Sequence, residues 1–151
     1  NDYVVLDGPS RLDAGARAVF DMADVNLLVM QLIVTSVRNT DRILQELGRH
    51  GYNLDRVQLI CNRATRESGH LELEHVQATL DRQVFWSIPD DFKTVSGAIN
   101  LGEPLAVCAA RSKVRQSIRD LARRFCDSPD GREDGAAGKK SAGVLRKLLS
   151  G

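Results

Sequence analysis

Four short hydrophobic runs recur along the chain, and each is followed by a longer stretch in which apolar residues return at helical spacing. The runs lie at Tyr3–Leu6, Val25–Met30, Val57–Cys61 and Val84–Ile88. Alternation of short strands with amphipathic helices is typical of βαβ units. The runs are almost continuously apolar, as expected for strands that are buried on both faces. The pattern therefore predicts an open α/β fold, with a parallel sheet covered by helices.

The clearest helical pattern covers Val37–Arg49, where apolar residues form a single stripe. Ser36 is predicted to cap the start of this helix, and Gly51 to end it. Three further helices are expected, at Leu71–Leu80, Phe92–Asn100 and Lys113–Phe125.

The composition changes after residue 126. Residues 127–138 are rich in Ser, Pro, Gly and charged groups and contain no large apolar side chain, which predicts a flexible linker. Residues 139–151 form a basic amphipathic tail. Its apolar members are Val144, Leu145, Leu148 and Leu149, and its basic members are Lys139, Lys140, Arg146 and Lys147. Such a pattern favours binding to an anionic membrane. A disordered end, or a helix that docks onto a protein partner, is the alternative.

Length and charge limit the other classes. A chain of 151 residues with 42% hydrophobic content suffices for one domain, which we expect over residues 1–126. The net charge of +1 gives no overall attraction to nucleic acid or membranes. Three widely separated cysteines fit neither a disulfide framework nor a metal knuckle. No apolar run reaches the roughly 20 residues that span a bilayer. The chain opens without methionine directly at a strand pattern, so we interpret Asn1 as an internal boundary.

Polar groups follow three of the predicted strands. Asp7 ends the first run, Asn62 and Arg63 end the third, and Pro89 and Asp90 end the fourth. Open α/β sheets bind their ligands at the carboxyl ends of their strands. Asp7 is thus a candidate for a magnesium–nucleotide site, although a carboxylate in Asp-Gly-Pro is equally suited to starting a turn. The asparagine amide offers the donor and acceptor that a purine edge requires.

Other chemistry finds little support in the sequence. His70 and His75 are five residues apart without a third ligand, which does not fit a metal site. No serine or cysteine lies in a nucleophile setting. The chain contains no G-x-x-x-x-G-K-[ST] loop. These residues alone are therefore not expected to hydrolyse ATP.

Several segments, in order, resemble the MinD/ParA family of P-loop ATPases, and the match runs from about Asp2 to Phe125. The segments are Asp7-Gly8-Pro9, residues 35–44, Asn62-Arg63, residues 88–91 and Gly102-Glu103-Pro104. Residues 36–39 and Gly51-Tyr52 look most like the CpaE/TadZ-type pilus-assembly proteins within that family. The resemblance implies a partial doubly wound parallel sheet of the P-loop NTPase type, without its N-terminal P-loop unit.

The resemblance also implies roles for individual residues. Asp7 would hold Mg²⁺ through water and is the catalytic candidate. Asn62, beside Arg63, would meet the adenine of ATP, and Pro89 with Asp90 would line the base pocket. The phosphate-binding lysines of the family belong to a Walker A loop that would precede Asn1, so ATP and Mg²⁺ both require that upstream part.

At the level of function, the resemblance implies an ATP-dependent positioning protein. It would form a homodimer around nucleotide and sit in the cytoplasm on the inner face of the cytoplasmic membrane, where it localises a pilus or secretion machine. Arg11 stands where the family has a glycine in D-x-P-x-G, which favours the alternative of a non-hydrolysing scaffold.

A DNA-partitioning ATPase of the ParA type is the third alternative, because the last predicted helix is strongly basic. Its basic residues are Arg111, Lys113, Arg115, Arg119, Arg123 and Arg124. The near-neutral net charge and the lack of accompanying aromatic residues favour a solvated helix face instead, so nucleic acid is not an expected partner.

Overall fold

The computed structural model describes residues 3–8, 13–65 and 71–126. The predicted linker and tail, together with Pro9, Arg11 and His70, lie outside the described residues. The chain divides into two compact units, Asn1–Ile118 and Arg119–Gly151. The sheet and its covering helices belong to the first unit.

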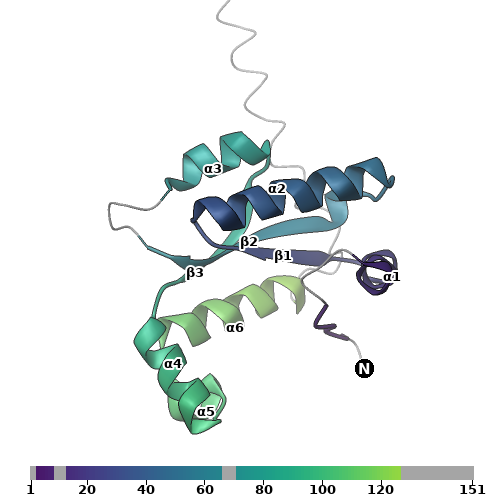
Figure 1. Ribbon diagram of the computed structural model, residues 1–151. Coiled ribbons are helices and arrows are strands. Elements are labelled where there is room, and N and C mark those ends of the chain that lie inside the picture. Colours follow the sequence, from purple (N-terminus) through teal and green to yellow (C-terminus); the bar gives the residue numbers. More distant parts are fainter. Residues whose placement is uncertain (1–2, 9–12, 66–70, 127–151) are drawn as a thin grey trace, which may run out of the picture. The chain divides into compact units, whose positions relative to one another are not determined.

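Within the described residues, three strands form one parallel sheet in the order β1-β2-β3 (Figure 1). Leu28 pairs with Leu59, and Ile60 pairs with Trp86. The elements in chain order are α1 (Ala14–Met22), β1 (Asn26–Met30), α2 (Val34–Arg49), η1 (Leu54–Arg56), β2 (Val57–Ala64), α3 (Leu73–Leu80), β3 (Val84–Pro89), α4 (Phe92–Leu101), α5 (Leu105–Cys108) and α6 (Lys113–Cys126). The predicted α/β class with a parallel sheet is confirmed.

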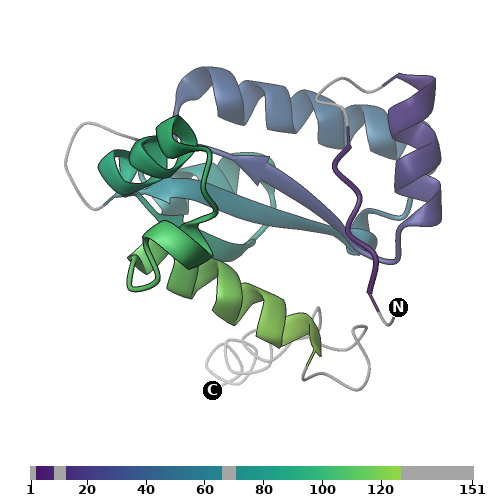
Figure 2. The same ribbon diagram turned by 90° about the horizontal axis from the view of Figure 1, so that it is seen from below.

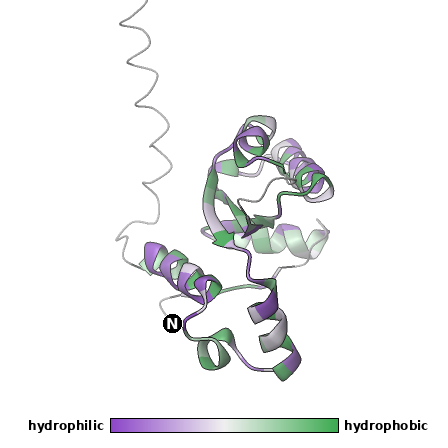
Figure 3. Ribbon diagram, turned by 90° about the vertical axis from the view of Figure 1, so that its left-hand side faces the viewer, coloured by the Kyte–Doolittle hydropathy of each residue, from purple (hydrophilic) through white to green (hydrophobic). Residues whose placement is uncertain are grey.

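The main core lies between the sheet and the two helices α2 and α3, which share one face of it (Figure 1). Leu47 in α2 and Cys61 in β2 are completely buried. The other buried members are Met30, Leu32, Val37, Leu44, Val57, Leu59, Val76 and Leu80. The helices contain both hydrophobic and hydrophilic residues (Figure 3), as expected when one side of a helix covers a sheet.

The opposite face of the sheet is joined to the first part of α6 through a short hydrogen-bonded chain. The indole N–H of Trp86 donates to the Ser117 hydroxyl at 2.9 Å. That hydroxyl donates in turn to the Ser87 carbonyl at 3.3 Å. These bonds hold residues 113–118 along β3, so helices lie on both faces of the sheet.

Helix α2 begins three residues earlier than predicted. Its N-cap is Ile33, and Ser36 lies inside the helix, so the predicted capping role of Ser36 is wrong. The Ser36 hydroxyl instead accepts from the backbone N–H of Gln31 at 3.0 Å, which fixes the turn from β1 into the helix. The predicted stop is confirmed: Gly51 has φ +77°, and the following N–H, that of Tyr52, returns to the Leu47 carbonyl.

The prediction of a strand at Tyr3–Leu6 is wrong. Residues 3–8 form no strand (Figure 2), and the apolar side chains of Tyr3–Leu6 are 50–94% exposed. A strand needs a neighbour for its backbone groups, and β1 pairs only with β2 among the described residues. Strand β1 also departs from the expected burial on both faces, because Leu27 and Val29 are 43% and 57% exposed.

Two helices were not predicted from the sequence. Helix α1 begins after Asp13, whose carboxylate accepts from the Ala16 N–H at 2.9 Å and so caps the helix. Helix α5 is a single turn after Pro104. None of the helices in the described ranges is long and apolar enough to cross a bilayer.

Candidate functional site

The carboxyl ends of β2 and β3 bring four of the predicted site residues together. Ala64 pairs with Pro89, and the Asp90 N–H donates to the Ala64 carbonyl at 3.0 Å. Asn62 and Arg63 directly precede Ala64 in β2. The two strand ends are therefore joined side by side, as expected for neighbouring parallel strands.

Arg63 has an unusual backbone. Its φ of +56° lies in the left-handed region, which non-glycine residues rarely occupy. The Asn62 side-chain oxygen accepts from the Arg63 N–H at 2.9 Å and supports this turn. The pairing of β2 with β3 is irregular between Cys61 and Ala64. Such backbone strain is concentrated at functional sites in proteins, and here it sets the direction of the Arg63 side chain.

Two contacts hold the guanidinium of Arg63. Its Nε donates to Asp90 Oδ1 at 2.8 Å, a charge-assisted bond between half-exposed groups. Its central carbon lies 5.3 Å from the centroid of the Phe92 ring, within the range of a cation–π contact. Arg63 therefore links the ends of both strands to the first residue of α4.

Asp90 and its neighbour Asp91 have different roles. The Asp91 carboxylate accepts from the Thr94 N–H at 3.3 Å and caps α4. This leaves Asp90 to pair with Arg63. The sequence placed Asp90 at the site but could not separate the two roles, because both aspartates follow the strand.

This group suits a flat heteroaromatic base better than a phosphate. Asn62 offers amide hydrogen-bonding groups, Pro89 an apolar surface, and Arg63 a planar cation. The Arg63 charge is already balanced by Asp90, which weakens its attraction for an anion. The exposed face of such an arrangement can stack on a ring and read its polar edge.

The structure does not bring Asp7 into this group. Asp7 is exposed and follows an irregular segment, because the strand predicted before it is not formed. Within the described ranges, no cluster of three or more His, Cys, Asp or Glu residues is placed to hold a metal ion. In nucleotide sites Mg²⁺ is held by one or two carboxylates together with the phosphates and water, so Asp7 would need the phosphates beside it to hold the ion.

Cys61 precedes Asn62 and lies in the core. Burial raises the pKa of its thiol above the ordinary value of 9.0. A nucleophilic cysteine needs a lowered pKa and access to substrate. Cys61 is therefore a core residue, in agreement with the lack of a nucleophile setting in the sequence.

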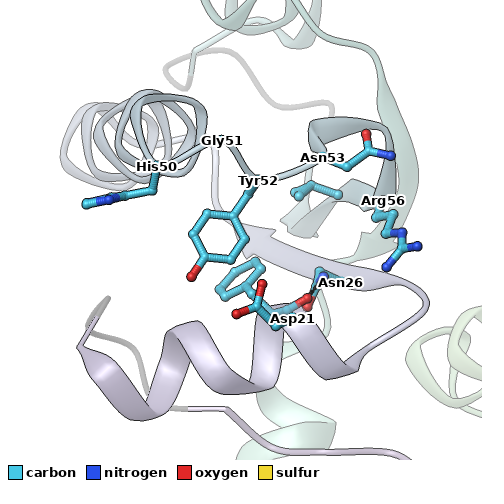
Figure 4. A pocket seen from close by; sticks show the side chains of 9 residues that line it. Asp21, Asn26, His50, Gly51, Tyr52, Asn53 and Arg56 are labelled. Atoms are coloured by element: carbon cyan, nitrogen blue, oxygen red, sulfur yellow. Dashed lines mark hydrogen bonds between the residues drawn. The ribbon is translucent and has the colours of Figure 1, made fainter.

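A hollow of about 260 Å³ lies near the opposite ends of the strands (Figure 4). Its lining includes Asn26 and Val57, the first residues of β1 and β2. The Phe20 and Tyr52 rings meet edge to face at 6.4 Å, and the Asn26 amide donates to the Phe20 carbonyl at 3.3 Å. These contacts join α1 to the α2–β2 connection. Because open sheets bind ligands at the carboxyl ends, this hollow is not the nucleotide candidate.

Solved P-loop NTPases of the MinD/ParA type also have a parallel sheet with helices on both faces, so the chain has the fold of that class. Solved structures share this fold. The ParA family ATPase of Chlorobium tepidum TLS superposes with a TM-score of 0.67 at 20% identity, over 74% of this chain and 46% of that chain. The MinD protein of Pyrococcus horikoshii, solved with Mg-ADP, superposes with a TM-score of 0.63 at 21% identity, over 91% of this chain and 50% of that chain.

Curated relatives are similar in sequence as well. The MinD protein of Thermotoga maritima is 24% identical over 82% of this chain and 46% of its own length. A putative MinD protein of Nephroselmis olivacea is 28% identical over 98% of this chain and 54% of its own length. No protein-family profile matches the chain. The chain spans about half the length of these relatives. The resemblance to MinD/ParA proteins is thus confirmed in sequence similarity and in fold.

Proposed function

We propose that this chain is the C-terminal part of an ATP-binding positioning protein of the MinD/ParA type. The convergence of Asn62, Arg63, Pro89 and Asp90 at the carboxyl ends of β2 and β3 carries the proposal. Similarity to MinD proteins, one of them solved with Mg-ADP, supports ATP as the ligand. Asn62 would bond the polar edge of the adenine, and Pro89 would pack against its ring.

The phosphates and Mg²⁺ would be held mostly by the part of the relatives that this chain does not cover. The open side of β1 supports this division. Among the described residues β1 pairs only with β2, Leu27 and Val29 are exposed on one face of β1, and the apolar segment Tyr3–Leu6 is exposed as well. A further strand and helix would cover these groups and complete the sheet. In the completed site Asp7 would contribute one carboxylate, acting on Mg²⁺ through water.

We further propose membrane attachment through residues 139–151. A few leucines and basic groups bind an anionic surface weakly, and a homodimer formed around ATP would strengthen the attachment through avidity. The protein would then act in the cytoplasm, on the inner face of the cytoplasmic membrane. Similarity of residues 36–39 and Gly51-Tyr52 to CpaE/TadZ-type proteins supports a pilus or secretion machine as the positioned partner.

A non-hydrolysing scaffold is the second candidate function, and Arg11 in place of the family's glycine favours it. Such a protein would bind ATP without turnover. ATP hydrolysis that rises in the presence of anionic lipid would exclude the scaffold.

The contacts of α6 support a solvated basic face over a DNA site. Asp120 forms ion pairs with Arg119 at 3.6 Å and with Arg123 at 3.8 Å. The Arg115 guanidinium donates to the Ala110 carbonyl at 2.9 Å. Part of the positive charge is therefore balanced or engaged within the protein.

Binding of Mg-ATP by the whole protein tests the proposal. Replacement of Asn62 by alanine (N62A) is expected to weaken binding of a fluorescent ATP analogue about tenfold, because the base loses a hydrogen-bonding partner. Asn39→Ala is the matched control, since Asn39 lies on the exposed surface of α2 and bonds Arg42. Equal affinity of the N62A and wild-type proteins would contradict the proposed base site.

A further inference from the structure

Phe92 is a large aromatic residue at an exposed position beside the candidate site. It is the first residue of α4 and is 63% exposed. Its ring lies 5.3 Å from the guanidinium carbon of Arg63. Phe92 thus contributes little to the core, and its described contact is with a residue of the site.

The ion pair with Asp90 does not fix the plane of the guanidinium by itself. The bond runs through one nitrogen, Nε, to one carboxylate oxygen at 2.8 Å. A single bond of this kind acts as a pivot, in contrast to the two parallel bonds of a bidentate pair. The Phe92 ring supplies a second contact, with its centroid 5.3 Å from the guanidinium carbon, and aromatic faces attract a guanidinium. Asp90 therefore fixes one end of the guanidinium, and the contact with Phe92 limits where the rest of the group can lie.

We propose that Phe92 is a positioning residue for a purine base, acting through Arg63. Phe92 backs the guanidinium on one side, and the base stacks on the other side, so that ring, cation and base form three layers. This inference rests on the proposed function and adds the mode of base recognition to it. Stacking does not discriminate between purine bases, whereas hydrogen bonds from the amide of Asn62 would distinguish their polar edges.

The left-handed backbone of Arg63 fits this role. A φ of +56° is costly for arginine, and the turn directs the side chain from the end of β2 toward Asp90 and Phe92. Arginine on a free surface loop would gain nothing from such strain. A platform for stacking needs a group that is held in place, and the turn at Arg63, the bond to Asp90 and the contact with Phe92 together restrain the guanidinium.

Calorimetric titration of the whole protein with Mg-ATP, Mg-GTP and inorganic tripolyphosphate tests the inference. Phe92→Ala is expected to weaken the binding of ATP and of GTP by a similar factor, about fivefold. Tripolyphosphate, which has no base, should bind the variant and the wild-type protein equally. Phe92→Tyr should restore wild-type affinity. Arg63→Lys keeps the charge but loses the planar group, so it should behave like Phe92→Ala.

The outcomes separate this inference from the proposed function. If wild-type protein binds ATP and Phe92→Ala binds it with unchanged affinity, the inference fails and the proposed function stands. An equal loss for ATP and tripolyphosphate would also contradict it, because the defect would then lie in the phosphate site. If wild-type protein binds no nucleotide, the proposed function fails and this inference fails with it.

Discussion

At the residue scale, the position of Arg63 could be predicted from the sequence, but its backbone conformation and its contacts could not. Its place at the end of a strand, next to Asn62, is readable from the hydrophobic pattern, and so is the approach of Pro89 and Asp90 from the next strand. Its left-handed backbone and its contact with Phe92 are not. Both depend on how the strand ends meet in space, and no periodicity in the chain records that. One sequence feature could have indicated the contact: Phe92, an aromatic residue, directly follows Asp90 and Asp91.

The three cysteines should differ sharply in reactivity. Cys61 is buried and has a raised pKa, whereas Cys108 and Cys126 are exposed. We expect a thiol reagent at neutral pH to label Cys108 and Cys126 rapidly and Cys61 only on unfolding. Mass spectrometry of tryptic peptides after a timed pulse measures this. Rapid labelling of Cys61 in native protein would show that the strand is open to solvent.

Cys61 should also make the fold weaker in alkali. Its pKa is higher in the folded state than the ordinary value of 9.0, so the folded protein holds the proton more tightly than the unfolded chain. The resulting stability is complete below pH 9.0 and is lost as the pH rises toward the folded pKa. Urea unfolding at a series of pH values should show a steeper alkaline decline for wild-type protein than for Cys61→Ala. Parallel declines would contradict this.

At the scale of elements, prediction succeeded where a single apolar stripe meets a buried strand. Helix α2 and strands β2 and β3 have strong patterns, and their boundaries in the structure differ from the predicted ones by at most three residues. No range was predicted for helix α1, which is nine residues long and buries only Ala16. Tyr3–Leu6 has the composition of a strand, but strand formation depends on a partner strand.

Helix α2 should be sensitive to substitutions on its buried side. Leu47 is fully buried between α2 and the sheet, so Leu47→Ala leaves a cavity and should cost about 2–5 kcal/mol of unfolding free energy. Leu101→Ala is the control, because Leu101 is 69% exposed on α4 and should change stability by less than about 0.5 kcal/mol. Urea titration of both variants measures the difference. Similar losses would contradict the position of the core.

At the scale of the whole molecule, the sheet explains why the chain resembles half of a larger protein. The described strands end at β1, whose side chains Leu27 and Val29 remain exposed, and the relatives continue for about as many residues again. The fold class followed from the pattern alone. The proposed base site could be read from the sequence only in part, and the 151 residues contain no phosphate-binding loop motif.

We propose that ATP controls attachment of this protein to a membrane. The most direct measurement is sedimentation of the whole protein with anionic liposomes, with Mg-ATP, with Mg-ADP and without nucleotide, beside a variant that lacks residues 139–151. We predict that wild-type protein pellets with liposomes in ATP and much less in ADP, and that the shortened protein stays in the supernatant in both. Pelleting that is independent of nucleotide, or unchanged after removal of residues 139–151, would contradict the account.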